Sequence, residues 1–406
     1  MKSRAKAILA CGLATLIFLL LFSLYGYDRT WRLWGISTMS PHFADLRNIT
    51  GGAESYAQGF DPMIKNPGDP WQRRMNYPRV WQSLYLIGIN QNHTTYIGIV
   101  FILLFLIGIC LILPQASNIT IALVMLAALS PATLLGIERG NNDLPIFFLV
   151  ALSVVAIKKS PILSAAVVLI GFVLKLFPIF GCSVLLRINR TMFWKYAVSL
   201  FVAGVMYLVL TYSDNLIIGE LSTKSMGLSY GVNVFWMRAM SLNLTMGWYA
   251  RLLSFLTVLI AFWYAFTALL RFDFPPEGQC EDKYLDAFRA GAAIYLGTFL
   301  LGDNYDYRLM FLILTIPQLV VWTKCSPRDI SLRSIGVILF IFLSQWYLFN
   351  RRIIYYLPYG HYVSYVIDQL FKWSVFFGLF YLFVWSMPNW TKGYAQKLYF
   401  LIKRST

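Results

Sequence analysis

Apolar runs separated by polar stretches constrain this chain more than any other feature of its sequence. The first run, residues 7–25, follows a basic start that contains Lys2, Arg4 and Lys6, and similar runs recur up to residue 385. A helix needs about 20 mainly apolar residues to cross a bilayer, so the pattern predicts repeated membrane spans. No small-residue cleavage site follows the first run, which favours an uncleaved span over a signal peptide.

The composition agrees with a membrane protein. Hydrophobic residues make up 58% of the chain and charged residues only 13%, against roughly 25% charged in soluble domains. The net charge is +16, but without a basic helix or an RNA-binding motif we expect no nucleic acid partner. We predict one all-α polytopic membrane domain over residues 1–406, with about ten full crossings plus a hairpin, hence ten to twelve transmembrane helices by convention.

Charges that flank the apolar runs predict the orientation. We expect the protein in the plasma (inner) membrane. Basic residues are enriched in cytoplasmic loops, so the N-terminus and the basic C-terminal tail are both expected in the cytoplasm. Residues 27–95 then form a large first extracytoplasmic loop. Residues 161–186 carry basic flanks on both sides and Lys175 and Pro178 near their centre. We therefore expect a re-entrant or hairpin element that is broken there.

The polar segments that look like motifs all fall on the predicted outer side. These segments are residues 43–77, 138–143, 213–247, 303–308 and 350–361. The predicted inner loops are plain basic connectors. We therefore expect the functional site to face outward.

Residues 43–77 carry Asp45 and Asp61. Linking two helices takes only a few residues, so a polar insertion of this length indicates chemistry or recognition. Asp45 is interpreted either as a helix N-cap, because apolar residues follow it at helical spacing, or as a general base. The two roles are compatible, since a helix N-terminus keeps a carboxylate ionised. Asp61, within the sequence GFDP, is either a turn residue or a substrate contact.

A second polar group lies at the outer end of a short apolar run. It contains Glu138, Arg139, Asn141 and Asp143. Charges at membrane depth are costly and tend to face a cavity or one another, so these residues are predicted to contact substrate. The alternative is that Glu138 and Arg139 only anchor the chain at the interface. Lys175, inside an apolar run, either reaches the cytoplasmic face or belongs to the site.

A third group, Asp303, Asp306 and Arg308, lies with two tyrosines at the outer edge of a span. Tyrosines at this level are typical of an aromatic belt, but such a belt does not explain the acids or the arginine. We predict that these charged residues contact substrate.

A fourth group, Arg351, Arg352 and His361, is also predicted outside, against the positive-inside bias. Guanidinium forks suit phosphate oxygens, so we expect Arg308 to meet Arg351 and Arg352 around an anionic head group. Contact with anionic membrane lipid alone is the alternative.

Cysteines and histidines give no metal signature. The five cysteines form no CxxC pair and none lies in a loop predicted outside, while the three histidines are isolated and form no HExxH. We therefore predict no metal, no cofactor and no disulfide framework.

These motifs together resemble a known group of enzymes. Asp45, the pattern Tyr56-x-x-Gly59, Asp61 with Pro62, and Tyr77 with Pro78 resemble the first outer loop of GT-C glycosyltransferases. The sequences ERGNND (138–143) and LKLFP (174–178) resemble glycosyltransferase family 87, which includes mannosyltransferases that use polyprenyl-phosphate mannose. The resemblance implies a GT-C-like bundle in which Asp45 is the general base and Tyr77 is a substrate contact. This chain has one acid where many GT-C enzymes have an adjacent pair, so we expect no metal dependence.

The resemblance implies an inverting glycosyltransferase. Nucleotide sugars are absent outside the cytoplasm, so the expected donor is a polyprenyl-phosphate hexose, mannose or glucose, and the expected acceptor is an envelope glycan or glycolipid. The alternative is a transporter or flippase of a lipid-linked or anionic substrate, which predicts inverted repeats and charges along a path. A membrane acyltransferase typically needs a histidine within a span, and none is predicted there.

Overall fold

The structure is a computed structural model, and it describes residues 2–222, 227–269, 282–356 and 358–393. In chain order the elements are α1 (Lys2–Leu33), α2 (Ala44–Ala57), η1 (Arg79–Ile87), η2 (Gln91–His93), α3 (Thr94–Ile112), α4 (Asn118–Ala128), α5 (Pro131–Arg139), α6 (Asp143–Ala156), α7 (Pro161–Leu174), η3 (Phe177–Arg187), α8 (Arg190–Leu210), α9 (Tyr212–Leu221), β1 (Ser229–Tyr230), α10 (Val234–Leu242), α11 (Leu244–Leu269), α12 (Leu285–Leu301), β2 (Asn304–Tyr305), η4 (Asp306–Leu314), α13 (Ile316–Cys325), α14 (Arg328–Gln345), α15 (Tyr347–Ile354) and α16 (Gly360–Trp385). The predicted all-helical fold is confirmed over the described chain, apart from two short strands.

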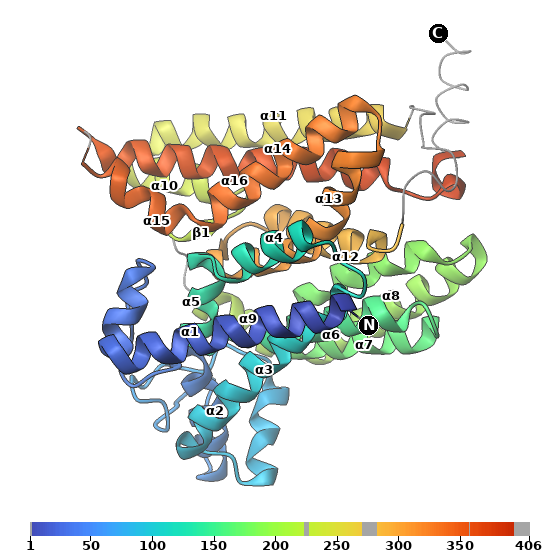
Figure 1. Ribbon diagram of the computed structural model, residues 1–406. Coiled ribbons are helices and arrows are strands. Elements are labelled where there is room, and N and C mark those ends of the chain that lie inside the picture. Colours follow the sequence, from blue (N-terminus) through green and yellow to red (C-terminus); the bar gives the residue numbers. More distant parts are fainter. Residues whose placement is uncertain (1, 223–226, 270–281, 357, 394–406) are drawn as a thin grey trace.

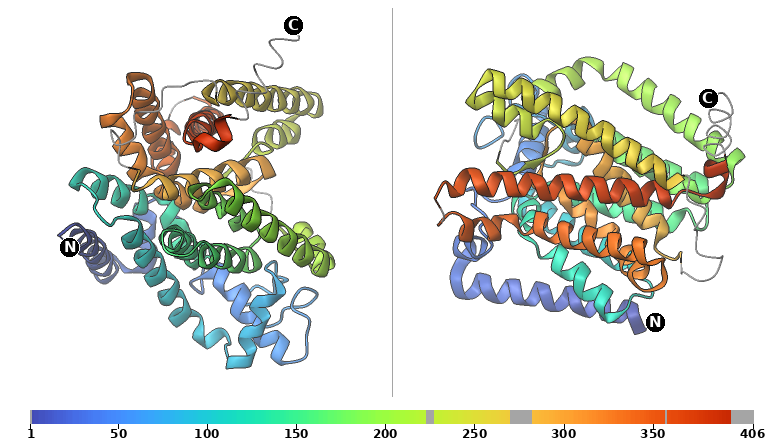
Figure 2. Two further views of the ribbon diagram at one scale, coloured as in Figure 1. Left: turned by 90° about the vertical axis from the view of Figure 1, so that its right-hand side faces the viewer. Right: turned by 90° about the horizontal axis from the view of Figure 1, so that it is seen from above.

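Helix α12 lies at the centre of the molecule, between two hydrophobic cores (Figure 1, Figure 2). Ala290 and Ile294 of α12 belong to the core formed with α3, α4, α6, α7 and η3. Phe288, Tyr295 and Phe299 belong to the core formed with α11, α13, α14 and α16. Opposite faces of α12 are thus buried in different cores, so α12 joins the N-terminal and C-terminal halves.

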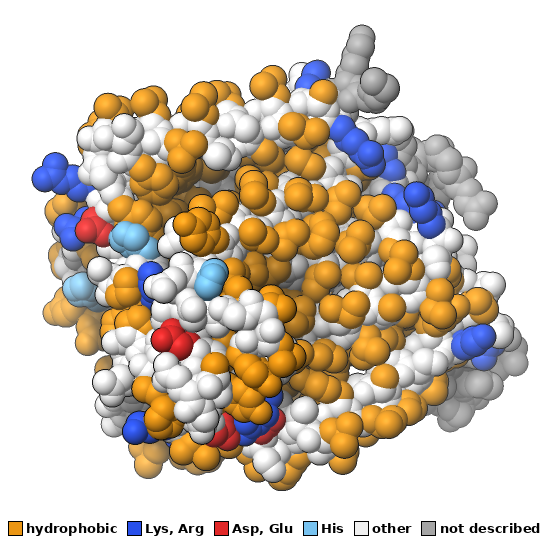
Figure 3. Space-filling view, turned by 90° about the horizontal axis from the view of Figure 1, so that it is seen from below, with side chains coloured by type: hydrophobic (Ala, Val, Ile, Leu, Met, Phe, Trp, Pro, Cys, Tyr) orange, Lys and Arg blue, Asp and Glu red, His pale blue; other side chains and the backbone are white. Residues whose placement is uncertain are grey.

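The outer helices have the apolar surface of membrane spans. Five helical segments of the described chain are long and apolar enough to cross a membrane, or up to eight if each of three bent helix pairs is one span. Hydrophobic side chains cover the middle of the face in Figure 3, while charged side chains gather toward its ends. So wide an exposed apolar surface needs lipid around it. The protein is therefore an all-helical multi-pass membrane protein.

The number of crossings stays a prediction. Helices α6, α7 and η3 are apolar but shorter than a full span, so a count of ten or more requires them to act as tilted or broken spans. The predicted break inside residues 161–186 is present. Helix α7 ends at Leu174, Lys175 has an extended backbone, and Pro178 lies in the first turn of η3. Proline lacks the N–H that a continuous helix needs, which explains the break.

The predicted first outer loop forms a lobe at the end of the bundle where α1 finishes, at the lower left of Figure 1. Gly26 interrupts α1 with a φ of 74°, so the last turns of α1 change direction before the lobe begins. The indole N–H of Trp81 in η1 donates to the Leu174 carbonyl at 3.0 Å. The lobe is thereby fixed to the broken end of α7.

The cysteines correct one expectation. Cys11, Cys110 and Cys182 are free, but Cys325 at the end of α13 is disulfide-bonded, so the prediction of no disulfide is wrong. Disulfides persist mainly in oxidising compartments, whereas the flanking charges predict a cytoplasmic position for this loop. The C-terminal bases that support a cytoplasmic C-terminus, Lys397, Lys403 and Arg404, lie outside the described residues.

Orientation is testable with two single-cysteine variants in a background without other reactive cysteines. We expect Lys65→Cys, exposed in the lobe, to react with an impermeant maleimide on intact cells. Lys159→Cys is the matched control, because Lys159 is exposed beyond α6, which begins beside the lobe and runs away from it for about 21 Å. It should react only after permeabilisation. The reverse pattern would place the lobe in the cytoplasm and the Cys325 disulfide outside.

Candidate functional site

A cavity of about 420 Å³ lies between the lobe, the end of α5 and the start of η4. Its polar lining consists of Asp45, Asn48, Arg73, Arg74, Asn76, Tyr77, Arg139, Tyr305 and Tyr307. Asp45 is the one carboxylate in this lining, and it shares the cavity with three guanidinium groups. A carboxylate surrounded by cations and phenols is suited to accept a proton next to an anionic ligand.

Asp45 lies in the first turn of α2, but it is not the N-cap. Phe43 holds the N-cap position with a left-handed backbone (φ 61°) and no side-chain cap. The N-cap interpretation of Asp45 is therefore wrong. The helix N-terminus still favours the ionised form of a carboxylate in the first turn.

Two glycines make room for Phe43 in this strained conformation. A Cβ on Gly140 would lie 2.9 Å from the Phe43 Cβ, and a Cβ on Gly98 would lie 2.9 Å from the Phe43 ring. A left-handed backbone is unfavourable for a bulky residue and persists only where packing enforces it. The contact between Phe43 and Gly140 holds the start of α2 against the loop after α5, and so sets the position of Asp45.

Asn141 joins Asp45 to that loop. Its side-chain amide donates to Asp45 Oδ2 at 2.6 Å, while its Oδ1 accepts the backbone N–H of Asp143 at 2.9 Å. Both ends of the amide are therefore engaged, which fixes the direction of the N–H donor. Lys175 also donates to Asn141 Oδ1, at 3.3 Å.

Asp143 binds two cations in the interior. Its carboxylate lies 2.6 Å from Lys175 Nζ and 3.3 Å from Arg308 Nε. Asp143 is fully buried and the two cations are only slightly exposed. Lys175 and Arg308 together carry one positive charge more than Asp143. The nearby carboxylate of Asp45, which Asn141 links to this group by hydrogen bonds, balances that charge when it is ionised. The group is neutral only when Asp45 is ionised.

The pKa of Asp45 reflects this balance. Burial raises the pKa of its carboxyl above the ordinary value, while the Asn141 hydrogen bond and the charges of Arg139, Lys175 and Arg73 oppose the rise. A carboxylate with a raised pKa is a stronger base than one in water. The surroundings thus increase the basicity of Asp45 while they keep its charge compensated.

Glu138 and Arg139 form an ion pair at the end of α5. Glu138 Oε1 accepts the backbone N–H of Met39 at 3.1 Å, and Arg139 donates to the Ser37 carbonyl at 3.2 Å. Both residues therefore hold the segment between α1 and α2, and Arg139 also lines the cavity. Neither is merely an interfacial anchor.

Arg73 and Arg74 were not among the residues predicted for the site. Arg73 binds Asp69 at 2.8 Å and also donates to the Ala44 carbonyl. Arg74 donates to the Met63 carbonyl at 2.7 Å and has no carboxylate partner in the described part of the chain. The sequence does contain a signal for them, because two adjacent arginines are unusual in a loop predicted outside, where basic residues are uncommon.

Several predicted site residues lie elsewhere. Asp61 binds Arg79 at 2.9 Å, and Asp306 binds Lys372 at 2.7 Å in the second core. Asp303, in the loop after α12, does not line the Asp45 cavity. The structure therefore groups Asp45, Tyr77, Glu138, Arg139, Asn141, Asp143, Lys175 and Arg308, and it separates the other predicted residues from them.

The predicted meeting of three arginines is wrong. Arg308 binds Asp143, whereas Arg352 donates to the carbonyls of Arg32 and Leu33 at the end of α1. Arg351 lines a different cavity together with His361. The three arginines therefore have different surroundings and do not form one group.

Fold and site together define an all-helical multi-pass membrane protein with a buried ionic network beneath a polar cavity. No protein-family model, curated protein or solved structure matches this chain. Within the described ranges, no group of three or more His, Cys, Asp or Glu side chains is arranged to hold a metal ion.

We expect Asp143→Asn to destabilise the protein, because Lys175 and Arg308 then lose the carboxylate that they share. Removing one partner of a buried ion pair costs about 3–5 kcal/mol. The measurement is the free energy of unfolding in detergent, or the thermal midpoint where unfolding is irreversible.

The matched control is Asp61→Asn, the same substitution in a pair that is about one-third exposed. Exposed ion pairs contribute about 0–1 kcal/mol, so the control should unfold close to the wild type. Equal losses in the two variants would show that Asp143 has no special structural role.

Proposed function

We propose that this protein is an inverting glycosyltransferase with a GT-C-like bundle, whose site is the cavity around Asp45. The donor is a polyprenyl-phosphate hexose, mannose or glucose, and the acceptor is an envelope glycan or glycolipid on the outer face of the plasma membrane. One observation carries the proposal: a single carboxylate of raised pKa lines a cavity that it shares with three arginines.

The reaction assigns one step to Asp45. An acceptor hydroxyl attacks the anomeric carbon, and Asp45 takes the hydroxyl proton as the new C–O bond forms. The bond between the anomeric carbon and the phosphate oxygen breaks, and its electron pair leaves with the polyprenyl phosphate. Attack opposite the leaving group inverts the anomeric configuration. The protonated Asp45 then loses its proton to solvent.

Arginines stabilise the leaving group in this proposal. A departing phosphate needs charge stabilisation more than protonation, and pre-positioned guanidinium groups supply it. Arg74 and Arg139 are the best placed, because both line the cavity and Arg74 has no carboxylate partner among the described residues. Arg73 is already neutralised by Asp69. Arg308 is held by Asp143, so it acts on the site only through the ionic network.

An apolar cavity next to the site supports a lipid-linked substrate. It has a volume of about 610 Å³, is lined mainly by side chains from α1, α3 and α4, and includes Phe43. Phe43 lies two residues before Asp45, so the apolar cavity ends at the helix that carries the base. A prenyl chain fits an apolar lining of this kind, with its phosphate on the polar side.

The alternative function, a transporter or flippase, is favoured by one observation. Lys372 lies between Asp306 and Asp368, 2.7 Å from each, and all three are buried. Buried charges in a membrane bundle often mark a transport path. These charges are paired with one another, however, and none of them lines a cavity described above.

We expect Asp45→Asn to reduce sugar transfer by roughly 10²–10⁴-fold, because the amide keeps the shape of the side chain but cannot accept the proton. Some loss of thermal stability is also expected, because Lys175 and Arg308 then exceed Asp143 by one uncompensated positive charge, so turnover is compared per folded enzyme. The measurement is turnover with a panel of lipid-phosphate sugars, read by mass spectrometry. Asp61→Asn is the control and should retain turnover. Near-normal transfer by Asp45→Asn would exclude Asp45 as the base.

The pH dependence gives an independent test. A general base acts when deprotonated, so kcat/KM should fall as the pH drops through the pKa of Asp45, which lies above the ordinary 3.8. In Asn141→Ala the loss of a hydrogen bond that lowers this pKa should shift the fall to higher pH. Asn76→Ala, a truncation in the same cavity, should leave its position unchanged. Identical profiles for the wild type and Asn141→Ala would contradict the assignment.

A further inference from the structure

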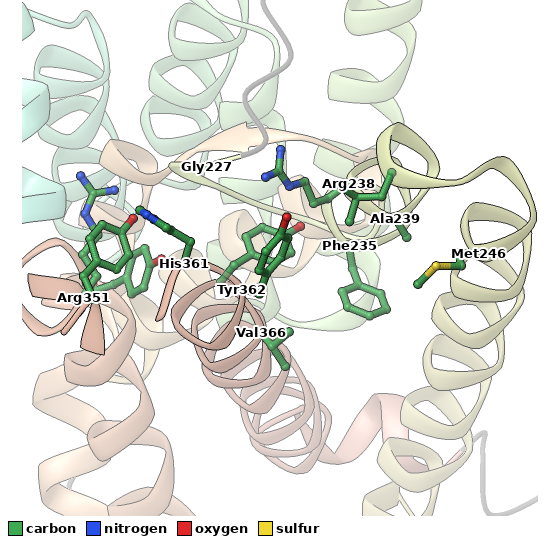
Figure 4. Close-up of a pocket in the computed structure, with 13 residues that line it drawn as sticks. Gly227, Phe235, Arg238, Ala239, Met246, Arg351, His361, Tyr362 and Val366 are labelled. Atoms are coloured by element: carbon green, nitrogen blue, oxygen red, sulfur yellow. The ribbon is translucent and has the colours of Figure 1, made fainter. Parts of the chain in front are cut away.

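A second polar cavity, of about 440 Å³, lies between α10, α15 and α16 (Figure 4). None of its lining residues lines the Asp45 cavity, although the two cavities adjoin. Gly227 lines this second cavity and Leu228 lines the Asp45 cavity. Consecutive residues of one segment therefore contact the two cavities, and a hydrogen bond of 2.9 Å from the Asp306 N–H to the Leu228 carbonyl holds this segment in place.

Two arginines with no described carboxylate within ion-pair distance face this cavity. Arg238 extends from α10 and Arg351 from α15, and His361 and Tyr362 lie between them (Figure 4). Neither guanidinium forms a hydrogen bond or an ion pair with any described residue; Arg351 only lies over the Tyr355 ring, at 5.7 Å. The lining contains no Asp or Glu. Two guanidinium groups around one space that no carboxylate lines are suited to bind an anion.

Three acids lie near this cavity without lining it: Asp303, whose charge acts on Tyr365, and the pair Asp306 and Asp368. Asp306 and Asp368 each lie 2.7 Å from Lys372, beneath the floor formed by Tyr347, whose ring is 5.6 Å from Lys372 Nζ. Together they carry one negative charge more than Lys372, and Arg351 interacts electrostatically with Asp306, but neither carboxylate lines the cavity. Inside the cavity itself the two guanidinium groups face each other without a carboxylate among the described lining residues.

The other wall of the cavity is apolar and exposed. Leu242 and Met246 line it, and they are 53% and 56% exposed. Trp248 and Tyr249 continue this exposed apolar surface along α11. Tyr356 and Tyr359, beyond α15, are also strongly exposed. Exposed tyrosines and tryptophans of this kind are typical of the level of lipid head groups.

We propose that this cavity binds the phosphate-bearing head group of an anionic membrane lipid. The phosphate lies between Arg238 and Arg351, and the hydrocarbon chain follows Leu242 and Met246 onto α11. A soluble phosphate ester shares the anionic chemistry, but the exposed apolar wall favours a lipid. The site is independent of the chemistry at Asp45. Its occupant contacts Gly227, and so adjoins the segment that also bounds the Asp45 cavity.

The test measures lipid binding to the purified full-length protein by native mass spectrometry and by shifts of the thermal midpoint. The probes are short-chain phosphatidylglycerol, which is anionic, phosphatidylcholine, which carries a compensated phosphate, and glycerol phosphate, which has no chains. We expect phosphatidylglycerol to bind at least about tenfold more tightly than the other two, because two charge-assisted contacts and the apolar wall act together.

Variants locate the binding. Arg238→Gln combined with Arg351→Gln should lose the preference for phosphatidylglycerol, while the Lys/Lys double variant should keep part of it. Arg251→Gln is the matched control, because Arg251 is exposed on neighbouring α11, stacks near Trp236 and Trp248, and does not line the cavity. Its lipid preference should equal that of the wild type.

Three outcomes overturn the proposal. The first is a wild-type protein that shows no preference for phosphatidylglycerol. This outcome does not depend on whether the variants fold. The second is an equal loss of preference in the Arg251→Gln control, which indicates attraction by overall charge. The third is equally tight binding of glycerol phosphate, which excludes a lipid as the occupant.

Discussion

The ion pairs of Asp143 with Lys175 and Arg308 are the interaction on which the rest of the site depends. They join the start of α6, the break between α7 and η3, and the start of η4. In an apolar bundle an unpaired charge is unfavourable by several kcal/mol. If these three elements separated, at least one buried charge would lose its partner. Lys175 reaches Asp143 because α7 stops before it, which gives the interruption of this apolar segment a structural reason.

The same network determines the charge at Asp45. Three buried or nearly buried charges sum to plus one, and Asn141 connects them to the only carboxylate that lines the cavity. Phe43 holds the helix of Asp45 against the loop of Asn141 although its own backbone is strained. Strain of this kind persists where the surroundings over-determine a conformation, as they do at sites whose geometry matters. Position and charge of Asp45 thus have separate structural causes.

Sequence patterns could predict elements and depth but not the direction in which side chains face. Lys175 and Pro178 located the break after α7, and long apolar runs located the outer helices, because both signals are local. The prediction that Arg308, Arg351 and Arg352 lie at one end of the bundle is correct. Arg308 binds Asp143, however, while Arg351 faces a separate cavity and Arg352 contacts the end of α1. A helix end fixes depth in the membrane, while the position around the bundle depends on how all the helices pack.

Asp45 shows the same limit at a single residue. Its sequence context allowed both a capping and a basic role, since both use a carboxylate at the start of a helix. The structure gives the N-cap position to Phe43, and the amide that donates to the Asp45 carboxylate belongs to Asn141, 96 positions later in the chain. No local pattern contains that contact. The residues that decide what a carboxylate does are those that surround it in the fold, and here they come from the end of α5, the break after α7 and the lobe itself.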